Sequence, residues 1–520
     1  MSATGLAEVG ELDRALSVDQ HGIKPIPDGD RDSTAWQQFW IWFGANISPL
    51  QWVAGAIGPQ LGLSLVQSIV IMFVGQATGA LIFGAFTLMG KRTGVSQLAL
   101  SRMAFGRRGN DVPSIVTGLI TLSWIGVYTY VALDLATYCL HELGLPDNHA
   151  TEYSVAGVIM VIQLVIGTLG FYAIRTFEKW TVPVLAAVMA VMTVLAFSKG
   201  QVVWNHSTVH GSELFTAASA FMTAVGIGWG FSWAPWASDY SRFTRPELSE
   251  KSVYWASALA TFLALNWLGV LGAAMASSSA NSDPAELVAS LFGVMTIPVL
   301  LVIIHGAVAG NIQCVYSAPL CFLAGGIKIR RWLGSIVSGV VASAVLVGFL
   351  ASTEFVTSFT NYITSLVIWT ASWGTIVAID FFVLNRGRAD VTALYVSGET
   401  SRYGDIRGRS LVALLTGLVA GWAFEYGGAS LFQGPIARAA NGVDFSWLAS
   451  IVFGGLAYWC LARSAPSPAS GDRGGSSRPK PFRLAAPERR HSNASPELDP
   501  AAQHVCHDSM PLSGLRWRWQ

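Results

Sequence analysis

The feature that most constrains this chain is a long apolar stretch, residues 221–243, that contains residues unfavourable to a helix. A helix that crosses a bilayer needs about 20 mostly apolar residues, and the stretch is long enough. Its middle nevertheless contains Gly226, Gly228, Gly230 and Pro235. Glycine weakens a helix and proline removes a hydrogen-bond donor. Backbone groups freed in this way are tolerated at membrane depth only inside protein or beside a wet cavity, so the stretch predicts a cavity.

Composition places the chain among all-α polytopic membrane proteins. Of its 520 residues, 52% are hydrophobic and only 12% are charged, whereas about a quarter of the residues of a soluble protein are charged. Twelve segments are apolar and long enough to be transmembrane helices. They are residues 36–56, 64–90, 113–140, 153–174, 180–198, 215–238, 252–277, 291–324, 332–352, 359–384, 410–427 and 445–462.

The distribution of Lys and Arg predicts which side of the membrane each loop faces. The loops after the second, fourth, sixth, eighth and tenth segments carry nearly all of these residues, and the alternate loops carry only Lys199 and Arg438. Because cytoplasmic loops carry the excess, both termini are predicted to be cytoplasmic. The N-terminal residues lack the pattern of a cleavable signal peptide. We therefore expect a multi-pass protein of the plasma (inner) membrane.

A second interruption predicts an internal repeat. Residues 44–49 (GANISP) break the first apolar segment as the glycines and proline break the sixth. The two are the first and the sixth segments, five positions apart, so the halves that they open have opposite topology. A matched pair of interrupted segments is the best sequence indication of a transporter's central site. The expected organisation is a cytoplasmic arm, two inverted repeats, two further helices and a disordered cytoplasmic tail. These parts span residues 1–35, 36–198, 199–384, 385–462 and 463–520.

Aromatic and amide side chains in these segments are candidates for binding a flat, uncharged ligand. Trp229, Trp233 and Trp236 crowd the sixth segment. In the third, Thr121, Trp124 and Tyr128 share one helix face. In the eighth, Asn311 is costly to bury unless it meets a partner, and Cys314 shares its face. An amide edge matches the donors and acceptors of a heterocyclic base, although a hydrogen bond between helices would also satisfy Asn311.

Few ionisable residues fall inside the predicted segments. Asp134 and His305 are candidates for proton coupling, with a structural role as the alternative. Asp239, Asp380 and Glu425 lie near helix ends, where salt bridges are expected for the two aspartates. The five cysteines lack paired spacing, so no disulfide framework, metal site or cofactor is expected. A membrane-embedded enzyme is disfavoured because no nucleophile cluster or close acidic pair lies within a segment.

With these residues in view, the sequence resembles the nucleobase:cation symporter family, in its purine–cytosine permease branch. The resemblance extends from about Gly22 to Cys460. The stretches that carry it are 42–46 (WFGAN), Gly94, 102–106 (RMAFG), 123–126 (SWIG), 237–243 (ASDYSRF) and 315–317 (VYS). It implies a LeuT-like fold of two inverted five-helix repeats plus two helices, and import of a nucleobase with Na⁺ or H⁺ by a protein that works as a monomer and binds no nucleic acid.

Position by position, the resemblance also implies a substrate site. Trp124 and an aromatic residue of the sixth helix, Trp229 or Phe231, would sandwich the base, while Asn311 and Ser48 would hydrogen-bond its edge. Gly230 stands where bacterial cytosine permeases carry an aromatic residue. The implied site comprises Ser48, Thr121, Trp124, Trp229, Gly230, Ser232 and Asn311, to which helix periodicity adds Cys314.

The coupling ion follows from a departure from the family. Sodium-coupled relatives complete an ion site with first-helix carbonyls, here those of Gly44 and Ile47, and with hydroxyl groups of the eighth helix. At those positions of the eighth helix this chain has Gly306, Ala309 and Gly310, which carry no side-chain oxygen. We therefore expect coupling to H⁺ rather than Na⁺. The alternatives left open are a carrier of another cyclic amide (hydantoin, allantoin or uracil), an amino acid carrier, and a membrane sensor built on the transporter fold.

Overall fold

The computed structural model describes residues 12–146, 148–199, 202–278, 284–350, 355–396, 400–427 and 430–463. The chain divides into two units, Met1–Ala465 and Pro466–Gln520. The predicted C-terminal tail lies, beyond its first residue, outside the described residues, and so do the first residues of the predicted N-terminal arm.

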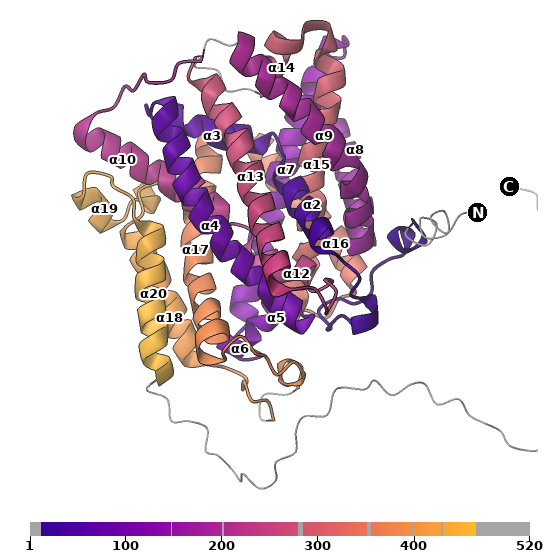
Figure 1. The fold of residues 1–520 in the computed structure, drawn as a ribbon, viewed down its shortest axis with the longest axis vertical. Helices are drawn as coiled ribbons and strands as arrows, with labels where there is room; N and C mark the ends of the chain where they lie inside the picture. Colours follow the sequence, from indigo (N-terminus) through magenta and orange to yellow (C-terminus); the bar gives the residue numbers. More distant parts are fainter. Residues whose placement is uncertain are drawn as a thin grey trace, which may run out of the picture. The chain divides into compact units, whose positions relative to one another are not determined.

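Helices account for nearly all of the regular structure (Figure 1). The first half of the chain contains η1 (Asp28–Asp30), α2 (Ala35–Asn46), α3 (Leu50–Gln60), α4 (Leu65–Thr93), α5 (Gln97–Leu100), α6 (Arg102–Phe105), α7 (Asp111–Glu142), α8 (His149–Leu169), α9 (Phe171–Lys199), α10 (Gly211–Phe221), η2 (Met222–Gly228), α11 (Trp229–Phe231), η3 (Ala234–Trp236) and α12 (Ala237–Ser241). The second half contains α13 (Glu250–Ala276), α14 (Pro284–Phe292), η4 (Gly293–Met295), α15 (Thr296–Ala324), α16 (Arg331–Leu350), α17 (Phe355–Ala378), η5 (Ile379–Leu384), η6 (Thr392–Leu394), α18 (Gly408–Ala423), η7 (Ser430–Phe432), α19 (Pro435–Ala439) and α20 (Ser446–Arg463).

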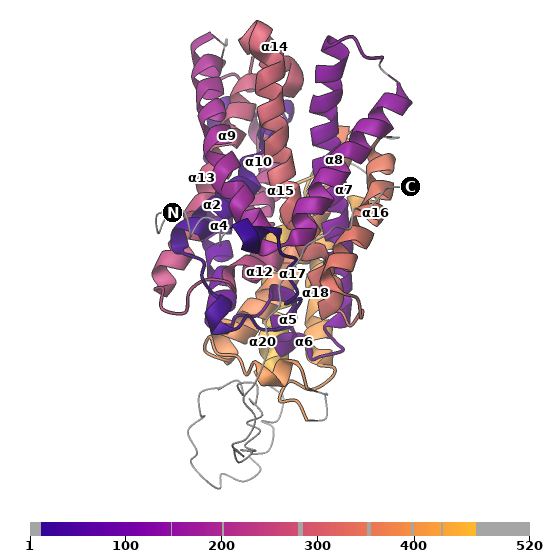
Figure 2. The same cartoon turned by 90° about the vertical axis from the view of Figure 1, so that its right-hand side faces the viewer.

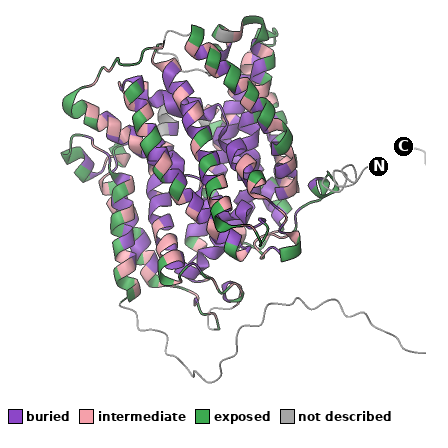
Figure 3. Ribbon diagram, in the orientation of Figure 1, coloured by how far each residue is buried: buried purple, intermediate pink, exposed green. Residues whose placement is uncertain are grey.

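Within the described residues, nine helical segments are long and apolar enough to cross a membrane. The remaining predicted spans correspond to the α2–α3 pair, α18 and α20, which are shorter or less apolar. Apolar residues remain exposed on outward faces, for example Val158, Val161 and Val165 of α8, while the interior is buried (Figure 3). This pattern is that of a helical bundle surrounded by lipid, and it confirms the class of an all-helical polytopic membrane protein.

The first helix is interrupted at the predicted place. A capping box of Thr34 and Gln37 starts α2, which ends at Asn46, and Ile47 leaves helical geometry at φ −83° and ψ 69°. Pro49 then caps α3. Proline lacks the N–H that a continuing helix would need but fits at a helix start, so the sequence ends one helix here and begins another.

The second interruption is spread over four short elements. After α10 the chain forms a π-helix, η2, then the single turn α11, the 3-10 helix η3 and the short helix α12. Gly228 and Gly230 fall inside this region and Pro235 stands within η3. The weak helix formers predicted from the sequence thus coincide with a change of helix type.

One predicted boundary is wrong, and the error matters for the site. The sequence predicts helices over 153–174 and 180–198 with a loop between them, whereas α8 ends at Leu169 and α9 begins at Phe171. The turn is the single residue Gly170, at φ +105°, a conformation that glycine adopts readily. Arg175 and Glu178, which a hydropathy profile assigns to a loop, therefore lie inside α9.

The helices pack so that the interrupted ones lie inside the bundle. The α2–α3 pair packs against α13, and α7 packs against α15 (Figures 1 and 2). The pair α18 and α20 packs against α17, away from α2 and α3. The N-terminal arm, residues 12–34, lies at the end of the bundle that also holds α5 and α6, since Ile26 bonds the end of α4 through Gly94 O at 2.8 Å. We call this end the arm end.

Candidate functional site

An aromatic cavity lies between α7, α15 and the interrupted region after α10. Its lining residues are Trp124, Tyr128, Trp229, Ser232, Trp233, Trp236 and Cys314. Its volume is about 10 Å³, close to the space of one water molecule. Sites for small molecules usually enclose about 300–1,000 Å³, so the walls are closed upon one another in this conformation.

The rings of the cavity pack edge to face. Trp124 and Trp229 have centroids 5.6 Å apart and planes at 82°, and Tyr362 lies 5.3 Å from Trp124 at 74°. Two indoles are fixed by hydrogen bonds: Trp233 Nε1 donates to Asn46 Oδ1 at 3.0 Å, and Trp236 Nε1 donates to Thr121 Oγ1 at 3.1 Å. The indole N–H of Trp124 has no hydrogen-bond partner. Trp124 is therefore held by packing alone.

Four of the predicted substrate residues line this cavity: Trp124, Trp229, Ser232 and Cys314. Thr121 lies behind it as the acceptor for Trp236, and Ser48 is buried in the interruption of the first helix, where its Oγ accepts from Leu50 N at 3.4 Å. Trp233, Trp236 and Tyr128 complete the lining. The aromatic wall predicted from the third and sixth helices is thus brought together in space.

Asn311, unlike these residues, is not part of the cavity lining. It is fully buried, and its Nδ2 donates to Ile125 O at 3.1 Å, Thr129 Oγ1 at 2.9 Å and Gln163 Oε1 at 2.8 Å. These contacts tie α15 to α7 and α8, which is the interhelical role that the sequence left open. Asn311 Oδ1 has no partner, and its contact with substrate remains a prediction.

Gly230 faces α4 rather than the cavity. A Cβ at this position would lie 3.0 Å from Gln76 Cα and 3.2 Å from Gly79 Cα. The glycine therefore allows close approach of α11 to α4, which explains why no larger residue occupies the position.

The residues predicted to hold a coupling ion are in close contact with other residues. A Cβ on Gly306 would be 2.7 Å from Ile47 O, and one on Gly310 would be 2.6 Å from the Tyr128 ring, so α15 abuts the interruption directly. The eighth-helix positions 306, 309 and 310 supply no side-chain oxygen, and Na⁺ requires oxygen ligands. Gly44 lies against the carboxyl of Glu178, because a Cβ there would overlap Glu178 Oε2. Among the described residues, positions 306, 309 and 310 of α15 therefore offer no side-chain ligand to a cation at this place, and the ion-coupling role of Gly44 and Ile47 stays a prediction.

Asp134 and His305 lie away from the aromatic cavity. Asp134 lines a separate hollow with Thr137 and Glu152. His305 is exposed and stacks on Phe177, with centroids 5.7 Å apart. A further hollow of about 640 Å³, lined by residues of α3, α10 and the segment after α18, includes none of the predicted residues.

Sequence reasoning missed Glu178 and Gln163. Glu178 and Gln313 are fully buried and meet across α9 and α15, with Gln313 Nε2 3.4 Å from Glu178 Oε1. The available signal was Gly170, whose single-residue turn would have moved Glu178 from a loop into a helix.

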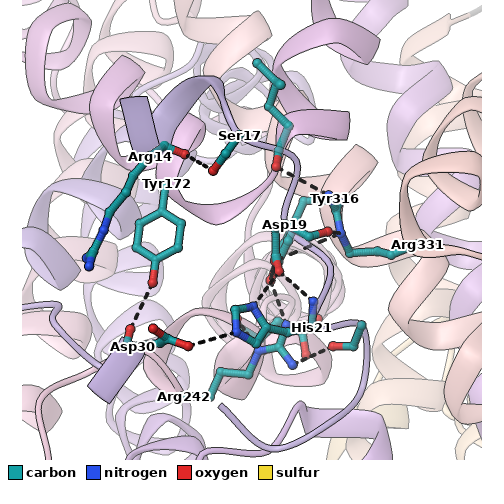
Figure 4. Close-up of polar contacts among 12 residues, drawn as sticks. Arg14, Ser17, Asp19, His21, Asp30, Tyr172, Arg242, Tyr316 and Arg331 are labelled. Atoms are coloured by element: carbon teal, nitrogen blue, oxygen red, sulfur yellow. Dashed lines mark hydrogen bonds and ion pairs between the residues drawn. The ribbon is translucent and has the colours of Figure 1, made fainter. Parts of the chain in front are cut away.

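A network of charged residues closes the arm end (Figure 4). We call it the arm network; its members are Asp19, His21, Asp30, Arg242, Tyr316 and Arg331. Asp19 Oδ1 lies 2.7 Å from His21 Nδ1, Tyr316 Oη donates to Asp19 Oδ2 at 3.1 Å, and Arg331 Nε donates to Asp19 O at 2.9 Å. Arg242 donates to Gly22 O and to Tyr316 Oη, each at 2.7 Å. The arm thereby connects the end of α12, the interior of α15 and the start of α16.

Burial alone would raise the pKa of Asp19, but the hydrogen bond from His21 and the charges of Arg331 and Arg242 together hold that pKa well below its usual range. The hydrogen bond that His21 donates to Asp19 conversely raises the pKa of His21, against the opposing effect of burial. The network is therefore a set of mutually stabilised charges.

These features define the class of the protein. A helical multi-pass membrane protein with two interrupted helices around an aromatic cavity is a transporter and not an enzyme. Residues 25–450 match the family model described as permease for cytosine/purines, uracil, thiamine, allantoin, and the chain belongs to this family.

Sequence relatives and a solved structure agree with this family assignment. The chain is 24% identical to YxlA of Bacillus subtilis (strain 168) over 86% of this chain and 96% of that protein. It is 23% identical to the purine-cytosine permease fcyB of Emericella nidulans, over 88% and 90%. Its fold matches that of Mhp1, a nucleobase-cation-symport-1 family transporter, in a closed conformation with bromovinylhydantoin bound, with a TM-score of 0.68 and 19% identity over 86% and 96%. The match identifies the fold as LeuT-like.

Proposed function

We propose that this protein is a secondary active transporter that imports a nucleobase, cytosine or a purine, in symport with H⁺ by alternating access. Twelve membrane spans, built as two inverted five-helix repeats plus two helices, form the carrier. The arm end faces the cytoplasm, in accord with the Lys and Arg of its loops, and both termini lie there.

The observation that carries the proposal is the aromatic cavity between α7 and the interrupted sixth helix, in a chain of the permease family. Trp124 and Trp229 stand at 82° in the closed cavity. To stack on both faces of a base, one ring must turn as the cavity opens, and no hydrogen bond holds the Trp124 indole against such a turn. Asn311 and Ser48 then recognise the base edge, which requires Asn311 to exchange one of its interhelical bonds.

Proton coupling is supported by the same positions that would hold Na⁺ in sodium-coupled relatives. Gly306, Ala309 and Gly310 supply no side-chain oxygen. Uptake measured in sodium and in choline buffer, each at two pH values, tests this part. An absolute requirement for Na⁺ would refute it.

Uptake of radiolabelled cytosine and purines by Trp124→Ala and Asn311→Ala tests the site. Both variants should lose binding, the first through lost stacking and the second through lost edge recognition. Trp255→Ala and Asn266→Ala are matched controls, because Trp255 is exposed on α13 and Asn266 Nδ2 bonds within its own helix at 2.9 Å. Unchanged uptake by both site variants would contradict the proposed site.

A second substrate class is another flat cyclic amide. The family description includes uracil and allantoin, and the matched closed Mhp1 structure holds a hydantoin. Competition of bases, hydantoins and amino acids against labelled cytosine separates the classes. Inhibition by hydantoins but not by bases would select this alternative.

A further inference from the structure

Glu178 is a buried carboxyl that the proposed substrate site does not use. It lies on α9 with its side chain fully buried. Gln313 Nε2, on α15, is 3.4 Å from its Oε1, a long contact for a hydrogen bond. Its other oxygen, Oε2, has no hydrogen-bond partner.

No cation of the described residues compensates this carboxyl. On its own helix, Arg175 pairs with Asp32 at 2.7 Å and Lys179 lies 5.3 Å from the Trp180 ring. Among the helices that pack on α9, α2 contains no charged residue. The acidic, basic and histidine residues of the others lie elsewhere: His305 on the exposed face of α15, Glu250 and Lys251 at the first turn of α13, His149 and Glu152 at the first turn of α8, and Glu286 on α14. The other titratable groups of α15, Cys314, Tyr316 and Cys321, supply no positive charge.

The physical consequence is that an ionised Glu178 carboxylate is unfavourable in this conformation. Burial of an ionised carboxylate without a paired charge costs several kcal/mol even after the surroundings relax. A carboxyl without such a partner keeps its proton instead. The protonated group retains one acceptor oxygen for Gln313, as observed.

Helix α2 covers the carboxyl directly. A Cβ at Gly44 would overlap Glu178 Oε2, so only glycine allows α2 to lie so close. The two residues that follow contact the aromatic cavity: Ala45 O accepts from Tyr128 Oη at 3.4 Å, and Asn46 Oδ1 accepts from Trp233 Nε1 at 3.0 Å. On α15, Gln313 is adjacent to Cys314, which lines the cavity. Any movement of α2 therefore changes the contacts both of the cavity and of Glu178.

We propose that Glu178 is the carrier of the coupled proton, and that α2 controls its access to water. This inference rests on the proposed function as an H⁺ symporter. With the cavity open to the outside, the Glu178 carboxylate takes one proton from hydronium, which forms an O–H bond and leaves a water molecule. As the carrier closes around the base, α2 and Gln313 bury the neutral acid. When α2 moves away from α9 toward the arm side, water reaches the carboxyl, the O–H bond breaks, and the proton leaves as hydronium on the cytoplasmic side.

The experiment uses the full chain in proteoliposomes with the membrane potential clamped at zero. Coupling of one proton to one base allows an inward gradient of one pH unit to support about tenfold accumulation. Wild-type protein should reach this ratio. Glu178→Gln should bind the base and exchange it across the membrane, yet accumulate it only to a ratio of about one. Glu425→Gln is the matched control, because Glu425 is also a buried carboxyl but accepts from Ser365 Oγ at 3.0 Å.

Accumulation by Glu178→Gln equal to that of wild type would overturn the assignment. Loss of accumulation in both glutamine variants would overturn it as well, because the effect would not be specific to Glu178. Should Glu178→Gln fail to fold, Glu178→Asp keeps a titratable group farther from Gly44 and should retain accumulation at a reduced rate. An Asp variant that folds and exchanges the base but does not accumulate it would count against the proposal.

A second measurement separates this inference from the proposed function. Infrared spectra of the substrate-free protein should show a carbonyl band of a buried carboxylic acid that is absent from Glu178→Gln and present in Glu425→Gln. A wild-type protein that transports no base would refute the proposed function, while the infrared band would still report whether Glu178 holds a proton. An identical spectrum for wild type and Glu178→Gln would overturn the inference whatever the substrate.

Discussion

The arm network and the surroundings of Glu178 bury a carboxyl in opposite ways. Asp19 has a fully buried side chain and meets His21 at 2.7 Å, Tyr316 at 3.1 Å and the Arg331 guanidinium at 3.9 Å. Glu178 meets one amide at 3.4 Å. We call the second place the Glu178 pocket and define it by Gly44, Glu178 and Gln313. One carboxyl is surrounded by donors and cations, and the other by a glycine and a neutral amide.

The two regions therefore respond differently to a change in their surroundings. A carboxylate with paired charges stays ionised and holds its neighbours in place. The arm network therefore stabilises the contacts between the N-terminal arm and the helices at the arm end. A buried carboxyl without a cation is stable only with its proton. Its protonation therefore changes when α2, the helix that covers it, moves. The following predictions test this contrast, in order of expected effect.

The largest loss of stability is expected from removing a positive charge of the arm network. Arg331→Met leaves Asp19 buried beside fewer positive charges, and removal of one partner of a buried pair costs about 3–5 kcal/mol. The measurement is thermal unfolding in detergent. Asp19→Asn with Arg331→Met should recover part of the loss, because the double variant no longer buries an unpaired charge. If Arg331→Met were as stable as wild type, the arm network would not be what stabilises the arm end.

A smaller loss is expected in the Glu178 pocket. Gly44→Ala adds a methyl group where Glu178 Oε2 lies, and overpacking of this kind typically costs about 1–3 kcal/mol. The Glu178→Ala background should relieve part of the cost, although a Cβ at 44 would still be 2.7 Å from Val182 Cγ2. Additive effects of the two substitutions would contradict the direct contact.

The arm network should also respond to pH. The pKa of His21 is raised by the hydrogen bond that it donates to Asp19, so the folded state binds a proton that the unfolded state loses at about pH 6.5. This contribution is complete below the unfolded pKa and is lost as pH rises through the raised folded value. Melting temperatures of wild type should therefore fall over that window relative to His21→Asn, by less than the loss in Arg331→Met. His206→Asn, at an exposed histidine, should follow wild type.

The smallest effect is expected at the surface. Arg92 Nη2 lies 2.7 Å from Glu250 Oε2, with 29% and 48% of the two side chains exposed. Exposed pairs contribute about 0–1 kcal/mol, and solvent screening places this one near the lower limit. Glu250→Gln should change the melting temperature little, and added salt should remove the difference. A loss comparable to that of Arg331→Met would refute the contrast between buried and exposed charges.

The sequence predicted the aromatic cavity better than its polar surroundings. Trp124 and Trp229 could be placed together because helix periodicity and the interrupted segments indicate which faces turn inward. The position of Asn311 on α15 was predicted, but its contacts with Thr129 and Gln163 were not, since they depend on how α8 packs against α7. Glu178 was missed because Arg175, Glu178 and Lys179 lower the local hydropathy and make the start of α9 look like a loop.

The places where the membrane helices are interrupted follow from the sequence, because glycine and proline act on their own backbone and on the residues next to them. Which buried groups carry charge depends instead on how the helices pack. The cost of a charge depends on the atoms packed around it, and the nearest polar partner of Glu178 comes from a residue 135 positions away. Asp19 and Glu178 are both carboxyls in the same chain, and only their neighbours make one a fixed anion and the other an acid.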